Sequence, residues 1–347
     1  MSLKILITGC AGFIGCHLSR YFLERQAHIV GIDNLSRPGS RANLAWLQTQ
    51  SNGNLDFYCQ DICSFNDIVN TFKRHAPFDI VIHEAAQVAV TTSTEDPRSD
   101  FEINAIGTFN LLEATRLYSP EAFFQYASTN KVYGKMDNVA VVRRNGRYEY
   151  RDLPAGISEE FPLDFHSPYG CSKGSADQYV RDYHRIFGLK TAVLRQSCIY
   201  GSRQFGIEDQ GWIAWFSIAS FLNKKITIYG DGRQIRDVLW VDDLVDAYLK
   251  IFENSRKTAG QIFNIGGGPE NILSILELVA LLKERGFLMT DPSMADWRPG
   301  DQKVFVSDIQ KVNQMAGWRP TTSVEEGLDR LSAWVADHEQ ILKDTLG

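Results

Sequence analysis

The sequence predicts an α/β protein in which a Rossmann-type, doubly wound parallel sheet is combined with a smaller, mixed α/β C-terminal portion. Two observations lead to this fold class. In the first half of the chain, short apolar runs alternate with longer amphipathic runs, which is the pattern of βαβ units. Runs such as Ile5-Leu6-Ile7 and Ile80-Val81-Ile82 are apolar at every position, which is typical of parallel strands buried on both faces.

The individual elements follow the same periodicities. In the first half, we expect strands at 4–8, 28–33, 55–60, 79–83, 123–127 and 191–195, and helices at 13–26, 65–74, 98–117 and 168–187. After residue 200 the pattern loosens, and we expect strands at 226–229, 235–240 and 261–265 with helices at 212–223, 243–253, 274–285 and 324–342. These elements suggest a first domain at 1–200 and a smaller one at 201–347, with some later segments returning to the first. The polar, arginine-rich segment 135–165 is expected to be a loop or hairpin that covers substrate.

Composition and charge exclude several functional classes. The chain is 44% hydrophobic and 22% charged, as in ordinary globular proteins, and its net charge of −6 gives no reason to expect a nucleic-acid partner. No apolar run approaches the roughly 20 residues that span a bilayer, and we expect neither a membrane partner nor a signal peptide. The six cysteines lack metal-ligand spacing. We therefore expect reduced thiols, no metal site and a cytoplasmic location.

A glycine-rich turn joins the first predicted strand to the first predicted helix. The spacing of Gly9, Gly12 and Gly15 is that of a dinucleotide-binding turn, in which the backbone and the helix N-terminus approach a pyrophosphate. Asp33 ends the second predicted strand, where a carboxylate binds ribose hydroxyls and repels a 2′-phosphate. This favours NAD, although Arg37 nearby is a residue type that accepts the phosphate of NADP. The further residues expected around this cofactor are Phe13, Ile14, Asn34, Ser36, Asp61, Ile62, Ala85, Ala86 and Gln87.

The predicted chemistry depends on three side chains. Tyr169 and Lys173 are four residues apart on a predicted helix and therefore share a face. A nearby positive charge lowers the pKa of a phenol, which suits proton exchange with a sugar hydroxyl. Thr129, at the end of a predicted strand, offers a hydroxyl to the same site. We predict that these three residues are catalytic and that Tyr169 and Lys173 also contact the cofactor.

Together with the motifs STNKVYG at 128–134 and YGCSK at 169–173, these residues resemble the extended short-chain dehydrogenase/reductases that act as nucleotide-sugar epimerases and dehydratases. The resemblance covers essentially the whole chain. It implies that the C-terminal portion binds the nucleotide sugar and that Asn104 contacts the cofactor. It also implies substrate contacts from Gln87, Asn130, Lys131, Ser197, Arg236, Arg298 and Asp301.

Two positions depart from the family pattern. The 4,6-dehydratases of the family carry Asp-Glu after the threonine, whereas this chain has Asn130-Lys131, which disfavours dehydration. Relatives usually have asparagine where Ser197 stands, so phosphate binding would depend more on the arginines. Segments such as 33–46 and 201–216 are most similar to family members that invert carbon 2 of a CDP-linked dideoxyhexose. The resemblance thus implies tightly bound NAD and a role in bacterial O-antigen biosynthesis.

Two alternatives keep the same fold and cofactor. A UDP-hexose 4-epimerase would share all three catalytic residues, and a non-catalytic NAD-sensing regulator would share the scaffold. The family resemblance also suggests a homodimer or homotetramer, which the residues alone do not decide. Two long predicted helices carry apolar residues that could form a two-fold helix-bundle interface. On the first of these helices, they are Phe101, Phe109, Leu112 and Leu117.

Overall fold

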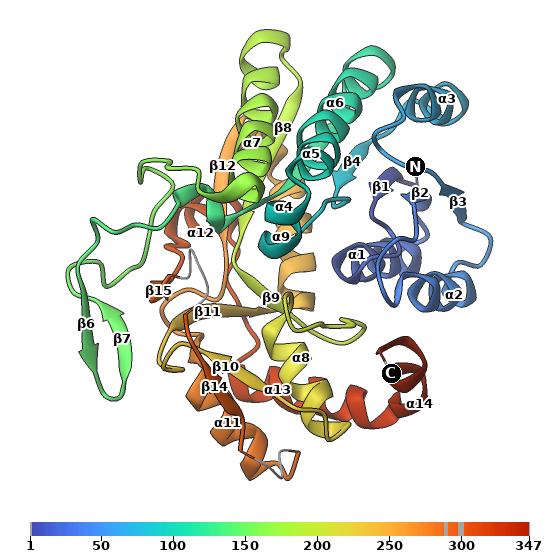
Figure 1. Cartoon of the computed structure of the whole chain (residues 1–347). Coiled ribbons are helices and arrows are strands. Elements are labelled where there is room, and N and C mark those ends of the chain that lie inside the picture. Colours follow the sequence, from blue (N-terminus) through green and yellow to red (C-terminus); the bar gives the residue numbers. More distant parts are fainter. Residues whose placement is uncertain (1, 288–290, 298–301, 347) are drawn as a thin grey trace.

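The computed structural model describes residues 2–287, 291–297 and 302–346, and its centre is a seven-stranded sheet (Figure 1). Its strands, in order across the sheet, are β12 (Gln261–Ile265), β8 (Lys190–Gln196), β5 (Phe123–Thr129), β4 (Ile80–His83), β1 (Lys4–Thr8), β2 (His28–Asp33) and β3 (Leu55–Cys59). All neighbouring pairs are parallel. The chain winds outward from β1 in both directions, which confirms the doubly wound prediction. We had grouped 261–265 with the smaller portion, but it pairs with β8 and forms an edge of this sheet.

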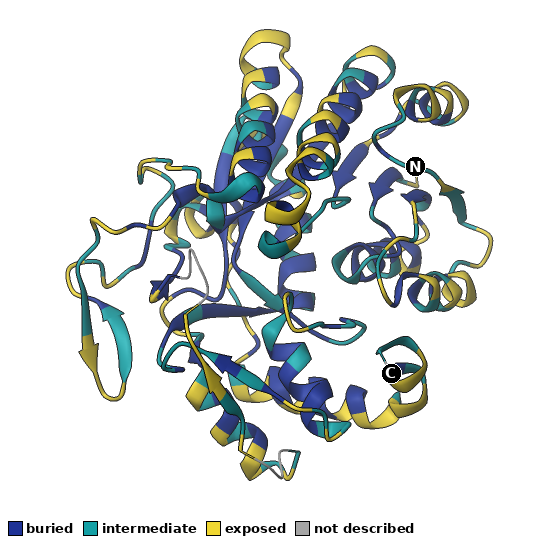
Figure 2. Cartoon of the chain, in the orientation of Figure 1, coloured by how far each residue is buried: buried dark blue, intermediate teal, exposed yellow. Residues whose placement is uncertain are grey.

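Helices cover both faces of the sheet because successive strand residues point to opposite sides. In β1, Ile5 and Ile7 pack into one hydrophobic core and Leu6 packs into the other. The first core is covered by α1 (Phe13–Glu24), α2 (Ser40–Gln50), α9 (Val241–Glu253) and α12 (Gln310–Ala316); the second is covered by α3 (Phe65–His75), α6 (Gly107–Tyr118) and α7 (Ser167–Phe187). Figure 2 shows the result, with buried strands between helices whose outer faces are exposed.

The helix α2 and the helices between residues 90 and 118 differ from the prediction. We did not predict α2, because its buried positions include Ser40 and Asn43 and therefore give no apolar stripe. The single helix expected at 98–117 is α5 (Pro97–Phe101), a π-helical turn (Glu102–Ile106) and α6, preceded by the short α4 (Val90–Glu95). Such π-helical turns are rare and often occur at functional sites.

The smaller portion packs around its own core, which includes Phe216, Trp240, Leu278 and Leu331. Its strands are β9 (Cys198–Tyr200), β10 (Thr227–Tyr229), β11 (Ile235–Trp240), β13 (Ile272–Ser274), β14 (Ser293–Ala295) and β15 (Val304–Phe305). Its helices are α8 (Trp212–Phe221), α11 (Ile275–Glu284), α13 (Val324–Asp337) and α14 (Glu339–Leu346), while the short α10 (Ser255–Thr258) follows α9. In place of the single helix expected at 324–342 there are two helices, because α13 ends at Asp337 and α14 begins at Glu339.

Segment 135–165 contains a hairpin of β6 (Val141–Arg144) and β7 (Arg147–Tyr150), which projects at one side of the molecule in Figure 1. Tyr148 at this hairpin donates a hydrogen bond to Asp231 (2.8 Å), so the hairpin is attached to the smaller portion. Within the described ranges, no helix combines the length and apolarity needed to cross a membrane.

Candidate active site

The turn between β1 and α1 forms one wall of a cavity of about 460 Å³. Gly9 has a φ angle of +69°, and a Cβ atom there would lie 2.8 Å from the backbone nitrogen of Ala85. A Cβ atom on Gly15 would lie 2.0 Å from the carbonyl oxygen of Gly9, whereas one on Gly12 would meet only Gly9, at 3.0 Å. No side chain caps the N-terminus of α1. The backbone N–H groups of its first turn are therefore available to an anion.

The structure brings the predicted cofactor residues together around this cavity. Apart from Asn104, all of them line it: Gly9, Gly12, Phe13, Ile14, Gly15, Asp33, Asn34, Ser36, Arg37, Asp61, Ile62, Ala85, Ala86, Gln87, Tyr169 and Lys173. These residues come from the carboxyl ends of four strands and from α7. They meet beside β1, where the winding direction of the sheet reverses, which is the usual ligand site of this fold.

Asp33 faces the turn from the end of β2. Its carboxylate accepts hydrogen bonds from the N–H groups of Ala11 (3.1 Å) and Leu35 (2.7 Å). Burial raises the pKa of Asp33, and these backbone donors oppose the rise. Arg37 lines the same cavity, and burial lowers the pKa of its guanidinium. The carboxylate is thus placed where it can accept hydrogen bonds from the hydroxyls of an unphosphorylated ribose.

The three predicted catalytic side chains meet between β5 and α7. Thr129 is the last residue of β5, while Tyr169 and Lys173 lie one turn apart on α7, and all three are buried. The ammonium group of Lys173 donates a hydrogen bond to the carbonyl oxygen of Ala127 (2.6 Å). The hydroxyl of Thr129 lies close enough to the phenol of Tyr169 to lower its pKa. A hydroxyl, a phenol and an ammonium are therefore held in one small volume.

The pKa of Tyr169 is shifted in the direction opposite to our prediction. We expected Lys173 to lower it, but burial raises the pKa of Tyr169 to about 12, although the hydroxyl of Thr129 opposes this rise. Burial also lowers the pKa of Lys173 to about 8, opposed by nearby carboxylates. Desolvation disfavours the charged form of each group, and it is the largest influence on both.

Asn104 lies in the π-helical turn behind the cavity. Its Oδ1 accepts a hydrogen bond from the N–H group of Gln87 (2.9 Å), and its Nδ2 donates to the carbonyl oxygen of Gln87 (3.0 Å) and to Ser172 Oγ (3.1 Å). These bonds hold the loop after β4 against α7. Asn104 is therefore placed to position Gln87, which itself lines the cavity.

Asn130 and Lys131, which were predicted to contact substrate, do not line the cavity. They begin a 3₁₀ helix (Asn130–Tyr133), and Thr129 Oγ1 accepts a hydrogen bond from the N–H group of Lys131 (3.3 Å). Asn130 is buried, and its Oδ1 accepts a long hydrogen bond from Thr129 Oγ1 (3.4 Å).

Other predicted substrate residues also have partners within the protein. The hydroxyl of Ser197 donates to the carboxylate of Asp237, which also accepts hydrogen bonds from two backbone N–H groups. Arg236 Nη1 donates to the carbonyl oxygens of Ile235 (2.8 Å) and Gln302 (2.9 Å). Arg298 and Asp301 lie outside the described residues.

We did not predict a polar network on the cavity wall. The hydroxyl of Tyr248 donates to Glu84, and Gln196 Nε2 donates to the Tyr248 oxygen (2.9 Å). Burial raises the pKa of Glu84 to about 7, opposed first by this hydrogen bond. Tyr248 is contributed by α9, more than 160 positions further along the chain than Glu84. No local spacing in the sequence marks such a pair.

A loop after β9 was also missed as part of the site. The guanidinium of Arg203 in this loop lies 3.7 Å from the centre of the Trp46 ring on α2. The loop residues that line the cavity are Arg203, Gln204, Phe205, Gly206, Ile207 and Gln210. The family-like stretch 201–216 was the available signal, but we had assigned no binding role to it.

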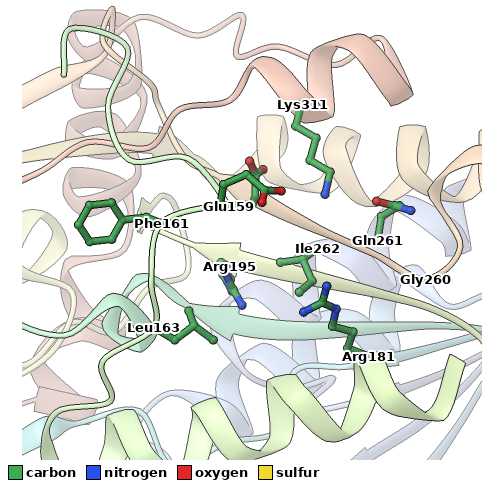
Figure 3. A pocket seen from close by; sticks show the side chains of 10 residues that line it. Glu159, Phe161, Leu163, Arg181, Arg195, Gly260, Gln261, Ile262 and Lys311 are labelled. Atoms are coloured by element: carbon green, nitrogen blue, oxygen red, sulfur yellow. The ribbon is translucent and has the colours of Figure 1, made fainter. Parts of the chain in front are cut away.

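A second cavity of about 250 Å³ lies beside β12 at the edge of the sheet (Figure 3). Its charged lining residues are Glu159, Glu160, Arg181, Arg195 and Lys311, and it contains none of the predicted site residues. Arg195 forms a buried ion pair with Asp177 (2.9 Å), whose carboxylate also accepts a hydrogen bond from Ser128 Oγ (2.7 Å). This ion pair supports the end of β5, beside Thr129.

Comparison with known proteins gives the class of protein that this fold and site define. Residues 6–331 match the family model described as GDP-mannose 4,6 dehydratase. The chain belongs to the extended short-chain dehydrogenase/reductase family of nucleotide-sugar epimerases and dehydratases.

Three individual members of this class are similar to this chain over nearly the whole length of both proteins. CDP-paratose 2-epimerase of Salmonella typhi is 44% identical over 339 residues, which cover 96% of this chain and 99% of that protein. UDP-glucose 4-epimerase of Thermotoga maritima, solved with UDP-glucose, has a TM-score of 0.82 at 31% identity and covers 97% of this chain and 100% of its own. UDP-glucuronic acid 4-epimerase of Bacillus cereus, solved with UDP-glucuronic acid and NAD, has a TM-score of 0.80 at 29% identity, covering 96% and 99%. This protein is a nucleotide-sugar enzyme that uses NAD, and the open Gly12 backbone and the Asp33 carboxylate fit that cofactor.

Proposed function

We propose that this enzyme inverts carbon 2 of CDP-paratose to give CDP-tyvelose and retains NAD throughout turnover. The main support is the 44% identity to CDP-paratose 2-epimerase across nearly the full length of both chains. The buried cluster of Thr129, Tyr169 and Lys173 provides groups for proton transfer. Tyvelose is a bacterial surface-polysaccharide sugar, so this activity would supply O-antigen precursors in the cytoplasm.

The roles of the three side chains follow from their positions. NAD, when bound, supplies a hydride acceptor and a positively charged ring that lowers the pKa of a nearby phenol. Tyr169, as phenolate, takes the proton of the carbon-2 hydroxyl, while Thr129 hydrogen-bonds to the same oxygen. Lys173 holds positive charge beside the phenol and contacts the nicotinamide ribose. The 2-keto sugar then presents its other face, and Tyr169 returns the proton to the oxygen as the inverted configuration forms.

A UDP-hexose 4-epimerase is the second candidate, supported by the similarity to the T. maritima 4-epimerase structure. It would use the same three side chains on a differently oriented sugar. Dehydration is disfavoured because an amide at Asn130 offers no titrating group, and Lys131 cannot replace a carboxylate in the same geometry.

A substrate panel distinguishes these functions. Purified protein, without added NAD, is incubated separately with CDP-paratose, CDP-tyvelose, UDP-glucose and UDP-galactose, and each reaction is followed by proton NMR. We expect interconversion of the two CDP sugars at a kcat/KM at least about 100-fold above that for either UDP sugar. Turnover of the UDP sugars alone would establish the 4-epimerase. Inactivity toward all four sugars with NAD still bound would support the NAD-sensing regulator.

We also propose a homodimer formed through α6 and α7. The outer surface of this helix pair, and of α5 and the π-helical turn before it, exposes Phe101, Ile106, Phe109, Leu117, Tyr179, Ile186 and Phe187. Leu112, which we had placed on this surface, is fully buried and is removed from it. Light scattering should give twice the chain mass of 39.2 kDa, and a Phe109→Glu/Leu117→Glu variant should be monomeric. Four times the chain mass would indicate the tetramer instead.

A further inference from the structure

A cluster of two histidines and one aspartate lies far from the active site. His28 begins β2, Asp56 is the second residue of β3, and His75 ends α3. The first two lie near the amino-terminal ends of their strands, whereas the NAD cavity lies at the carboxyl ends. These residues are separated in the sequence, which is why their spacing predicted no metal site.

The potential ligand atoms of this cluster lie close to one another. One ligand atom from each residue lies within 4.8 Å of the other two. His28 Nε2 is 2.9 Å from Asp56 Oδ2, and His75 Nδ1 is 3.7 Å from the same oxygen. Tetrahedral zinc with bonds of about 2.0–2.1 Å requires ligand atoms roughly 3.3 Å apart, so small side-chain rotations suffice.

The surroundings of His75 favour its Nδ1 as a ligand atom. Its Nε2 lies 2.7 Å from the hydroxyl of Tyr58, which occupies that nitrogen and fixes the ring. Ligating histidines commonly have such a partner on the second nitrogen.

We propose that His28, Asp56 and His75 bind one divalent transition-metal ion of the zinc type. Two imidazoles and one carboxylate are a ligand set that zinc uses in proteins, with water completing the coordination. The side chains of His28 and Asp56 are 35% and 44% exposed, so an ion reaches them from solvent. The bound ion would join β2, β3 and α3 at the outer end of the sheet.

Positive charge near the cluster opposes this binding. Lys4 pairs with His28 across β1 and β2, and Arg74 precedes His75 at the end of α3. The guanidinium of Arg74 also donates a hydrogen bond to the Tyr58 hydroxyl (3.3 Å). A Lys4→Gln substitution should therefore tighten metal binding, whereas substitution of a ligand residue should weaken it.

Titration of untagged, full-length protein with Co²⁺ and Zn²⁺ tests the proposal. Calorimetry should give one ion per chain, and Co²⁺ should give the absorption bands of nitrogen and oxygen ligation. Either His75→Gln or Asp56→Asn should weaken binding by at least about 100-fold, and Tyr58→Phe should weaken it by about 10-fold. His184→Gln, at a histidine whose Nδ1 lies 3.0 Å from the carbonyl oxygen of Leu189, is the matched control and should bind as the wild type does.

The results of these titrations distinguish metal binding at this cluster from metal binding at other residues. A thiolate-to-cobalt band would assign the ion to a cysteine such as the exposed Cys59 and overturn the proposal. Unchanged affinity in His75→Gln, or no binding at millimolar Co²⁺, would also overturn it. Circular dichroism confirms that each variant is folded, and His28→Gln provides a second test if His75→Gln is not.

Discussion

The cofactor side and the substrate side of this site differ in what their predicted residues contact: the cavity on the first side, and other parts of the protein on the second. On the cofactor side, the glycine-rich turn and the side chains predicted around it face a shared cavity. On the substrate side, Ser197 is hydrogen-bonded to Asp237, and Arg236 is hydrogen-bonded to backbone carbonyls. A motif that specifies backbone geometry thus locates a site by itself. A single polar residue does not, because its partner comes from a distant part of the chain.

The largest effect is expected at the point where the two sides meet. Tyr169→Phe should lower kcat by about 10²- to 10⁴-fold, because it removes the group that exchanges the proton. The NAD content, measured after denaturation, should stay at the wild-type level. Tyr179→Phe, on an exposed part of the same helix, is the control and should keep full activity. Substantial activity in Tyr169→Phe would exclude the phenol as the base.

A backbone change should disrupt the cofactor side alone. The added methyl group of Gly15→Ala would lie 2.0 Å from the Gly9 carbonyl oxygen, so the turn must shift. We expect NAD affinity to fall by about 100-fold, as for a displacement of about 1 Å at a binding site. In Gly170→Ala, the added Cβ meets nothing nearer than the Lys131 carbonyl oxygen at 3.4 Å, and NAD content should be unchanged. Normal NAD binding by Gly15→Ala would contradict the assignment of this turn.

Ser197→Ala tests whether Ser197 stabilises the fold or binds substrate. The substitution leaves the buried Asp237 with one donor fewer, which should lower the free energy of unfolding by about 1–3 kcal/mol. Urea denaturation measures this loss, and KM for the sugar nucleotide should be unchanged. A raised KM with unchanged stability would show that Ser197 binds substrate after all.

The smallest expected effect is a change in the pH dependence of stability, caused by Glu84 in the cavity wall. The pKa of Glu84 is raised from 4.5 to about 7, so its neutral form stabilises the fold below pH 4.5, and this contribution is lost as pH rises through about 7. Glu84→Gln, which stays neutral, should therefore be more stable than the wild type at pH 8, by on the order of 1 kcal/mol because the residue is partly accessible. The difference should vanish near pH 4. Thermal melts of both proteins across this range measure it, and parallel curves would contradict the raised pKa.

Local sequence patterns predicted most of the fold. Strands such as β2 and β11 have the expected bounds because period and apolar content agree there. The helix α2 was missed because Ser40 and Asn43 are two of its three buried residues, and the prediction for 98–117 failed to detect the π-helical turn. Neither feature leaves an apolar repeat in the sequence.

Prediction of the site was limited by long-range contacts. The Glu84–Tyr248 pair and the cluster of His28, Asp56 and His75 depend on packing between elements that are separated in sequence. The pKa of Tyr169 was predicted in the wrong direction because sequence shows the neighbouring lysine but not the extent of burial.

The most direct test of carbon-2 epimerisation by hydride return uses CDP-paratose deuterated at carbon 2, in ordinary water and without added NAD. The proposed mechanism predicts that the product, CDP-tyvelose, keeps the deuterium at carbon 2, because the same hydride leaves and returns. Mass spectrometry and deuterium NMR measure the label directly. Its replacement by solvent hydrogen during conversion would mean inversion through an enol intermediate and would contradict the account.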